Sequence, residues 1–199
     1  MDLIIFDLDG TLVDTKELHQ ESFAWALKQE DPNYDLPMED FLLLEGRPTL
    51  VKVEHLRKKY NWPLDTNRVY ENKQLHTIQH LKDFKYNLDI RDRLNRLSKK
   101  YHLALASNAR SGFVFEIITH MQLTMFEVIL SANYIPRHLA KPSPYIFLQC
   151  MKMVGVSPTS TIIFEDSEVG LIAAHASGAK VISVQNSVDA VEKMDLLCR

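Results

Sequence analysis

The chain begins MDLIIFDLDGTLVDT (residues 1–15), in which a short apolar run, Leu3 to Phe6, is followed directly by two aspartates. Side chains alternate along a β-strand, so residues i and i+2 share a face. The spacing therefore predicts that Asp7 and Asp9 point the same way, at the place where a buried strand ends. Two carboxylates this close repel each other and raise each other's pKa, so the pair indicates a bound cation or a chemical task.

Further short runs rich in β-forming residues predict four more strands. They are YHLALA ending at Ala106, FEVIL ending at Leu130, TIIFED ending at Asp166 and KVISV ending at Val184. Most are nearly continuous apolar runs, as expected for strands that are buried on both faces. Helix-length segments separate the later runs, so the pattern predicts an α/β fold with a Rossmann-like, doubly wound parallel sheet. Ligands bind such sheets at the carboxyl ends of the strands.

The alternation is interrupted once, between about Lys16 and Asp83, where only helical patterning is found. Examples are ELHQESFAWALKQ and PTLVKVEHLRKKY, and the segments DPNYDLP and NWPLD break the helices. The pattern predicts an all-helical insertion directly after the first strand. We expect an α/β core domain formed by residues 1–15 and 84–199, and a helical domain formed by residues 16–83.

The composition is that of an ordinary globular protein, with 199 residues, 46% of them hydrophobic, and a formal net charge of −3. This charge gives no electrostatic reason to expect a nucleic acid or an anionic membrane as a partner. Cys150 and Cys198 make neither a disulfide framework nor a metal site, and they suit a reducing compartment. The chain shows no signal peptide or membrane-spanning run, so we expect a cytoplasmic protein.

Four polar signatures follow the predicted strands in order. They are DLDGT from Asp7, Ser107-Asn108, KPSP from Lys141, and FEDSEVG with Glu165 and Asp166. Together they resemble the haloacid dehalogenase (HAD) superfamily, in the branch with a helical cap after the first strand that includes phosphoglycolate phosphatases and β-phosphoglucomutases. The resemblance covers nearly the whole chain. It implies a Mg²⁺-dependent phosphatase that hydrolyses a small phosphomonoester through an aspartyl-phosphate, with residues 16–83 as the cap.

The residue types fit this chemistry. Asp7 is the candidate nucleophile, because a carboxylate can attack phosphorus, and Asp9 is the candidate general acid and base. Lys141 is expected to offset negative charge, and Ser107 is expected to hold phosphoryl oxygens. The expected Mg²⁺ ligands are the oxygens of Asp7 and Asp166, and by resemblance the main-chain carbonyl of Asp9, with Glu165 acting through a bound water or only on the local field. The expected substrate-binding residues are Gly10, Asn108, Arg47 and His19.

Several alternatives remain open. Ser107 could cap the helix that starts near Ser111. A sugar phosphomutase is the main alternative function, since such members have a histidine at the place of His19, as do many plain phosphatases. Glu45 stands where the β-phosphoglucomutases have a basic residue, which favours the phosphatase, and YNLD around Asn87 replaces a common Pro-Gly. A non-catalytic phosphate-binding or regulatory protein is the third possibility. We expect a small phosphorylated metabolite as the partner, and a monomer or a weak homodimer.

Overall fold

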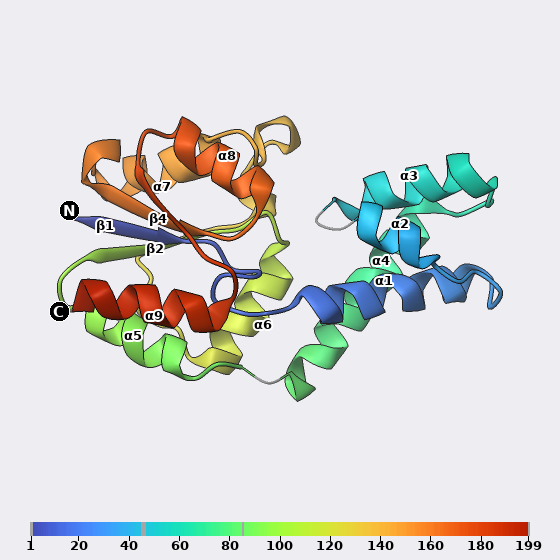
Figure 1. Ribbon diagram of the computed structural model, residues 1–199, viewed down its shortest axis with the longest axis horizontal. Coiled ribbons are helices and arrows are strands. Elements are labelled where there is room, and N and C mark those ends of the chain that lie inside the picture. Colours follow the sequence, from blue (N-terminus) through green and yellow to red (C-terminus); the bar gives the residue numbers. More distant parts are fainter. Residues whose placement is uncertain (1, 45–46, 85, 199) are drawn as a thin grey trace. The chain divides into compact units, whose positions relative to one another are not determined.

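The computed structural model describes residues 2–44, 47–84 and 86–198, and it divides into two compact units (Figure 1). Unit 1 consists of Met1–Asp14 and Lys85–Arg199, and unit 2 consists of Thr15–Phe84. The expected helical insertion falls within unit 2, whereas Glu45, which bears on the mutase alternative, lies outside the described residues. Every helix in the described part of the chain is too short or too polar to cross a lipid bilayer.

Unit 1 contains a sheet of parallel strands in the order β3-β2-β1-β4-β5. The strands are β1 (Leu3–Phe6), β2 (His102–Ala106), β3 (Val128–Leu130), β4 (Thr161–Glu165) and β5 (Lys180–Ser183). All five predicted strands are present, and the predicted doubly wound α/β fold is confirmed. The central strand β1 is fully buried along its length, which explains its unbroken apolar sequence.

Helices cover both faces of the sheet (Figure 1). On one face lie α7 (Tyr145–Val154) and α8 (Glu168–Ala176), and on the other lie α5 (Asp89–Leu97), α6 (Ser111–Met121) and α9 (Ser187–Cys198). Alternate strand residues such as Leu3 and Ile5 pack in one apolar cluster with buried residues of α7 and α8. Short 3₁₀ turns complete the unit at Ala132–Tyr134, Arg137–Leu139 and Pro158–Ser160.

All regular secondary structure in the described part of unit 2 is helical. Its elements are α1 (Lys16–Glu30), α2 (Met38–Leu43), α3 (Thr49–Tyr60), α4 (Thr66–His80) and the 3₁₀ turn η1 (Leu81–Asp83). The unit has an apolar core of its own, which includes Phe23, Leu56 and Val69. The buried carboxylate of Asp40 on α2 accepts hydrogen bonds from Tyr60 Oη at 2.5 Å and Lys59 Nζ at 2.9 Å, which join α2 to the end of α3.

Candidate active site

Polar side chains meet at the carboxyl edge of the central strands. Phe6 of β1 pairs with Leu105 of β2 and with Phe164 of β4, so the residues that follow these strands emerge at the same edge. Asp7 N donates to Phe164 O at 3.0 Å and Ser107 N donates to Leu130 O at 3.0 Å, which extends the ladder by one residue. The chain connections diverge on either side of β1, and ligands bind α/β sheets at such a point.

Lys141 lies at the centre of this edge, although it comes from the loop before α7. Its buried ammonium donates to Asp7 Oδ1 at 2.5 Å, to Glu165 Oε2 at 2.7 Å and to Ala106 O at 2.9 Å. These contacts use all three donors of a lysine ammonium. One positive group therefore joins the carboxyl ends of β1, β2 and β4.

Asn108 holds the main chain of Lys141 in place. Lys141 N donates to Asn108 Oδ1 at 3.2 Å, and Asn108 Nδ2 donates to Lys141 O at 3.4 Å. Ser107 Oγ accepts from Ala109 N at 3.0 Å, and the first amide of α6, Ser111 N, donates to Asn133 Oδ1 at 2.9 Å. Ser107 therefore shapes the turn after β2 and does not cap α6, so the capping alternative is wrong.

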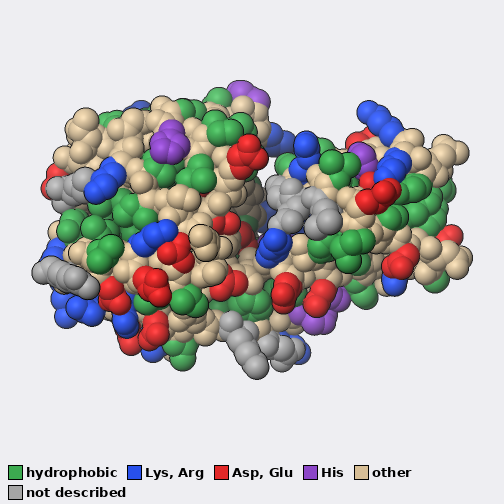
Figure 2. Space-filling model, in the orientation of Figure 1, with side chains coloured by type: hydrophobic (Ala, Val, Ile, Leu, Met, Phe, Trp, Pro, Cys, Tyr) green, Lys and Arg blue, Asp and Glu red, His purple; other side chains and the backbone are tan. Residues whose placement is uncertain are grey.

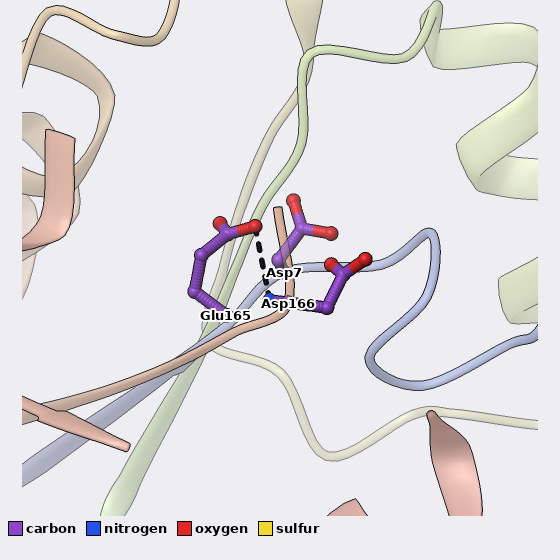
Figure 3. A group of neighbouring side chains, drawn as sticks. All are labelled: Asp7, Glu165 and Asp166. Atoms are coloured by element: carbon purple, nitrogen blue, oxygen red, sulfur yellow. Dashed lines mark hydrogen bonds between the residues drawn. The ribbon is translucent and has the colours of Figure 1, made fainter. Parts of the chain in front are cut away.

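Three carboxylates gather beside Lys141. Asp7, Glu165 and Asp166 each offer an oxygen atom within 4.8 Å of those of the other two (Figure 3). Glu165 Oε1 also accepts from Asp166 N at 3.2 Å and from Ser167 Oγ at 2.8 Å, so both oxygens of this side chain have protein partners. Thr11 Oγ1 donates to Asp166 Oδ1 at 3.3 Å, a contact that the sequence analysis did not anticipate.

Two glycines allow the acidic side chains to lie close to the backbone. Gly10 has a φ of +82°, and a Cβ atom there would lie 2.0 Å from Asp166 Oδ2. A Cβ atom at Gly170 would lie 2.1 Å from the Glu165 side-chain carboxyl carbon. Gly10 thus serves the turn after β1 and the placement of Asp166, while its expected part in substrate binding stays a prediction.

Burial and mutual repulsion shift the pKa values of this cluster. Burial raises the pKa of Asp7 well above its usual range, the charge on Glu165 adds to the effect, and Lys141 opposes it. Burial and the charge on Glu165 raise the pKa of Asp166 to about 7. Burial alone would lower the pKa of Lys141, but Asp7 and Glu165 outweigh it and hold that pKa above its usual range, so the ammonium stays charged.

The donor set suits a hard divalent cation. Carboxylate oxygens are the ligands that Mg²⁺ prefers, and Asp7 and Asp166 supply them directly after two adjacent strands, β1 and β4. Burial first, and the charge on Glu165 second, raise the pKa of Asp166, so the protein groups around it stabilise its ionised form poorly. A cation held by these residues would supply the missing positive charge.

The remaining predicted residues, Arg47 and His19, belong to unit 2. Arg47 is exposed, in the segment between α2 and α3. His19 on α1 lies with its Nδ1 atom 2.8 Å from Nζ of Lys73 on α4, and Lys73 is buried. The sequence analysis missed Lys73, because nothing in the helical pattern of residues 65–83 marks one lysine as buried.

A family model described as haloacid dehalogenase-like hydrolase matches residues 4–184, a range that contains every site residue of unit 1 named above. The chain belongs to this family. The fructose-1-phosphate phosphatase YqaB of Escherichia coli is 27% identical over 183 residues, which cover 92% of this chain and 95% of that protein. A phosphorylated carbohydrates phosphatase of Thermotoga maritima is 29% identical over 188 residues, which cover 92% and 84% of the two chains.

Solved structures agree with this family assignment. A HAD hydrolase of Entamoeba histolytica is 26% identical with a TM-score of 0.80, and the match covers 92% of this chain and 84% of that one. CbbY of Rhodobacter sphaeroides, solved with phosphate, shares the fold with a TM-score of 0.80 at 22% identity, covering 94% and 87%. The predictions of a HAD-like family, of its fold and of a phosphatase-type hydrolase are confirmed.

Proposed function

We propose that this HAD-family phosphatase hydrolyses a small phosphorylated sugar, with Mg²⁺ as its cation and an aspartyl-phosphate as its intermediate. The observation that carries the proposal is the buried contact of Lys141 with Asp7, at the strand edge where Asp166 also lies. A buried carboxylate beside a fixed positive charge can act as a nucleophile, because the charge lowers the repulsion between the carboxylate and an anionic phosphoryl group.

In this proposal the residues have distinct parts. An oxygen of Asp7 attacks phosphorus as the bond to the leaving oxygen breaks, and Asp9 gives that oxygen a proton. Asp9 then takes a proton from the water that attacks the aspartyl-phosphate, which restores Asp7 and releases phosphate. Ser107 and nearby backbone N–H groups hold the phosphoryl oxygens, and Asn108 fixes the main chain that carries Lys141.

The metal ligands in this proposal are Asp7, Asp166 and the main-chain carbonyl of Asp9. When bound, the cation offsets negative charge on the phosphoryl group. Glu165 orients Lys141 and the turn at Asp166 and Ser167, since its two oxygens already accept hydrogen bonds from these residues. Its expected metal contact through a water stays a prediction.

Unit 2 is the cap that selects the leaving group in this proposal, with Arg47 and the His19–Lys73 pair as its substrate-binding residues. The sugar-phosphate substrate class is supported by the names of the relatives from Escherichia coli and Thermotoga maritima. We place the protein in the cytoplasm as a monomer or a weak homodimer, in keeping with its free thiols at Cys150 and Cys198.

A substrate screen tests the proposal. Purified protein with Mg²⁺ is assayed for phosphate release from sugar phosphates, nucleotides and phosphoglycolate, with Asp7→Asn and excess EDTA as controls. We expect phosphate release from sugar phosphates that both controls abolish. Conversion of glucose 1-phosphate to glucose 6-phosphate, primed by a bisphosphate and with little phosphate released, would instead establish the mutase. No turnover of any substrate would favour the non-catalytic alternative.

A further inference from the structure

The chain crosses between the two units twice, and both crossings end near one serine. The first crossing follows Asp14, the last residue of the first segment of unit 1. The second precedes Lys85, and Asn87 follows shortly after it. The side chains of Asp14 and Asn87 both contact Ser187, the first residue of α9.

The contacts of Ser187 use its backbone and its side chain. Ser187 N donates to Asp14 Oδ1 at 2.8 Å, and Ser187 Oγ donates to Asp14 Oδ2 at 2.7 Å. Asn87 Nδ2 donates to the same hydroxyl oxygen at 3.4 Å. Ser187 is only 2% exposed, so water competes little for these bonds. One buried hydroxyl therefore joins two chain segments that lie far apart in sequence.

This anchor rests on two packed helices. Asn87 Oδ1 accepts from Asp89 N, the first residue of α5, at 3.1 Å. Further along, Arg93 of α5 donates to both carboxylate oxygens of Asp195 on α9, at 3.0 and 3.3 Å. Charged side chains of both signs lie intermixed over this part of unit 1 (Figure 2). Asn87 thus contacts the first residue of α5, and Asp14 contacts the first residue of α9, the helix that α5 packs against.

We propose that Ser187 is a positioning residue that couples the two crossings through Asp14 and Asn87. The anchor therefore holds together, on unit 1, the two places at which the chain leaves for unit 2 and returns from it. The relevance of this anchor to catalysis rests on the proposed function, because positioning matters only if unit 2 helps to hold the substrate.

Hydrogen exchange of the full chain tests the coupling without relying on activity. Asp14→Ala removes both acceptors at the first crossing. We expect it to speed exchange of the Asp89 and Ile90 amides at the second crossing by about three- to tenfold, the scale of one hydrogen bond. Asp14→Asn keeps an acceptor and should restore most of the protection. The matched control is Ser177→Ala, which removes a buried serine hydroxyl of unit 1 that donates to Ala174 O.

The coupling must also work in the other direction. Asn87→Asp keeps the acceptor for Asp89 N but places an acceptor against Ser187 Oγ, so it should speed exchange of the Ser187 amide, which is bonded to Asp14. Faster exchange throughout β1 in Asp14→Ala would mean that this variant destabilises the whole unit and does not test the coupling. Asn87→Asp then provides the test. Unchanged exchange at the remote crossing in Asn87→Asp overturns the proposal, as does unchanged exchange in a folded Asp14→Ala.

Kinetics separate the two proposals. If sugar phosphates are substrates, Ser187→Ala should lower kcat more than it changes KM, and combining it with Asp14→Ala should add little to the loss from Asp14→Ala alone. Full additivity of the two losses would contradict the coupling. If the wild-type chain releases no phosphate at all, the proposed function fails, while the exchange experiment still decides whether Ser187 couples the crossings.

Discussion

The contact between Lys141 and Asp7 gives the opening aspartates different environments. Asp7 is buried and bonded to the ammonium, whereas Asp9 is only partly buried in the turn that follows. A nucleophile needs a fixed position and charge compensation, and a proton carrier needs access to water and to the leaving group. The difference in burial matches the difference in the proposed roles.

Replacement of each aspartate should separate these roles. Asp7→Asn removes the nucleophile, so no phosphoenzyme should form from any substrate. Asp9→Asn removes the acid and base, which typically contribute about 10²–10⁴ in rate, and should accumulate an acid-stable, hydroxylamine-labile phosphoenzyme from an activated aryl phosphate. Rapid quenching with labelled substrate measures both. A phosphoenzyme in Asp7→Asn would place the nucleophile elsewhere.

The raised pKa of Asp166 predicts opposite pH trends with and without metal. Its value of about 7 lies above the value of about 3.9 for an unfolded aspartate, so the stability it contributes is fully present below about pH 3.9 and is lost progressively up to about pH 7. Deprotonation of the folded protein around pH 7 creates the metal ligand. Calorimetry should therefore show that the Tm of the metal-free protein falls up to about pH 7 and then levels off, and that the Tm gain on adding Mg²⁺ grows across a window from about pH 5.5 to pH 8.

Asp166→Asn is the control for this pH dependence, because it removes the titrating carboxyl while keeping an oxygen that can accept from Thr11. Both trends should weaken in the variant. A Tm gain from Mg²⁺ that is equal at both ends of the pH window in the wild type would contradict the assignment of Asp166 as a ligand.

Asp7, Asp9, Lys141 and Asp166 could be singled out from the sequence because each stands in a short motif after a strand-like run or before a helix. The contacts that hold these residues in place could not be predicted from the sequence. The side chain of Asn108 holds the backbone of Lys141, which depends on how two loops meet in space, while its expected part in substrate binding stays a prediction. Likewise, only the folded chain shows that Glu165 has protein partners for both oxygens.

At the level of elements, the central strands β1 and β4 were predictable because a strand buried on both faces needs an unbroken apolar run. β3 nevertheless begins at Val128, two residues later than expected, since Phe126 and Glu127 precede its ladder. The six-residue helix α2 was not predicted on its own. Its hold on α3 comes from the long-range bonds of Asp40, which no local pattern reveals.

The turn after β1 can be tested with a matched pair of glycines. Gly10 and Gly155 have φ values of +82° and +79°, but a Cβ atom at Gly155 would meet nothing within 4 Å, whereas one at Gly10 would collide with Asp166. Gly155→Ala should cost only the left-handed strain, about 1 kcal/mol of unfolding free energy, and keep full activity. Gly10→Ala should also displace Asp166 and lower kcat/KM by about 10²-fold. Equal kinetics in the two variants would show that the close approach of Gly10 to Asp166 is unimportant.

Across the whole molecule, the proposed reacting groups lie in unit 1, while unit 2 has its own apolar core and the candidate substrate-binding residues Arg47 and His19. This separation predicts that substrate selection can be changed without loss of the chemistry. An activated aryl phosphate needs little from a cap, because its leaving group scarcely needs protonation or positioning.

Arg47→Ala should therefore lower kcat/KM for the best sugar phosphate by about tenfold or more, the scale of a hydrogen bond between charged groups, and leave Mg²⁺-dependent hydrolysis of an aryl phosphate nearly unchanged. The matched control is Arg57→Ala, which removes an exposed arginine of α3 that donates to Glu54 Oε1 at 3.0 Å. Asp166→Asn should abolish hydrolysis of both substrates, because the metal site serves every leaving group. If Arg47→Ala slowed both substrates equally, Arg47 would act in the chemistry or in folding, and the division of labour between the units would be wrong.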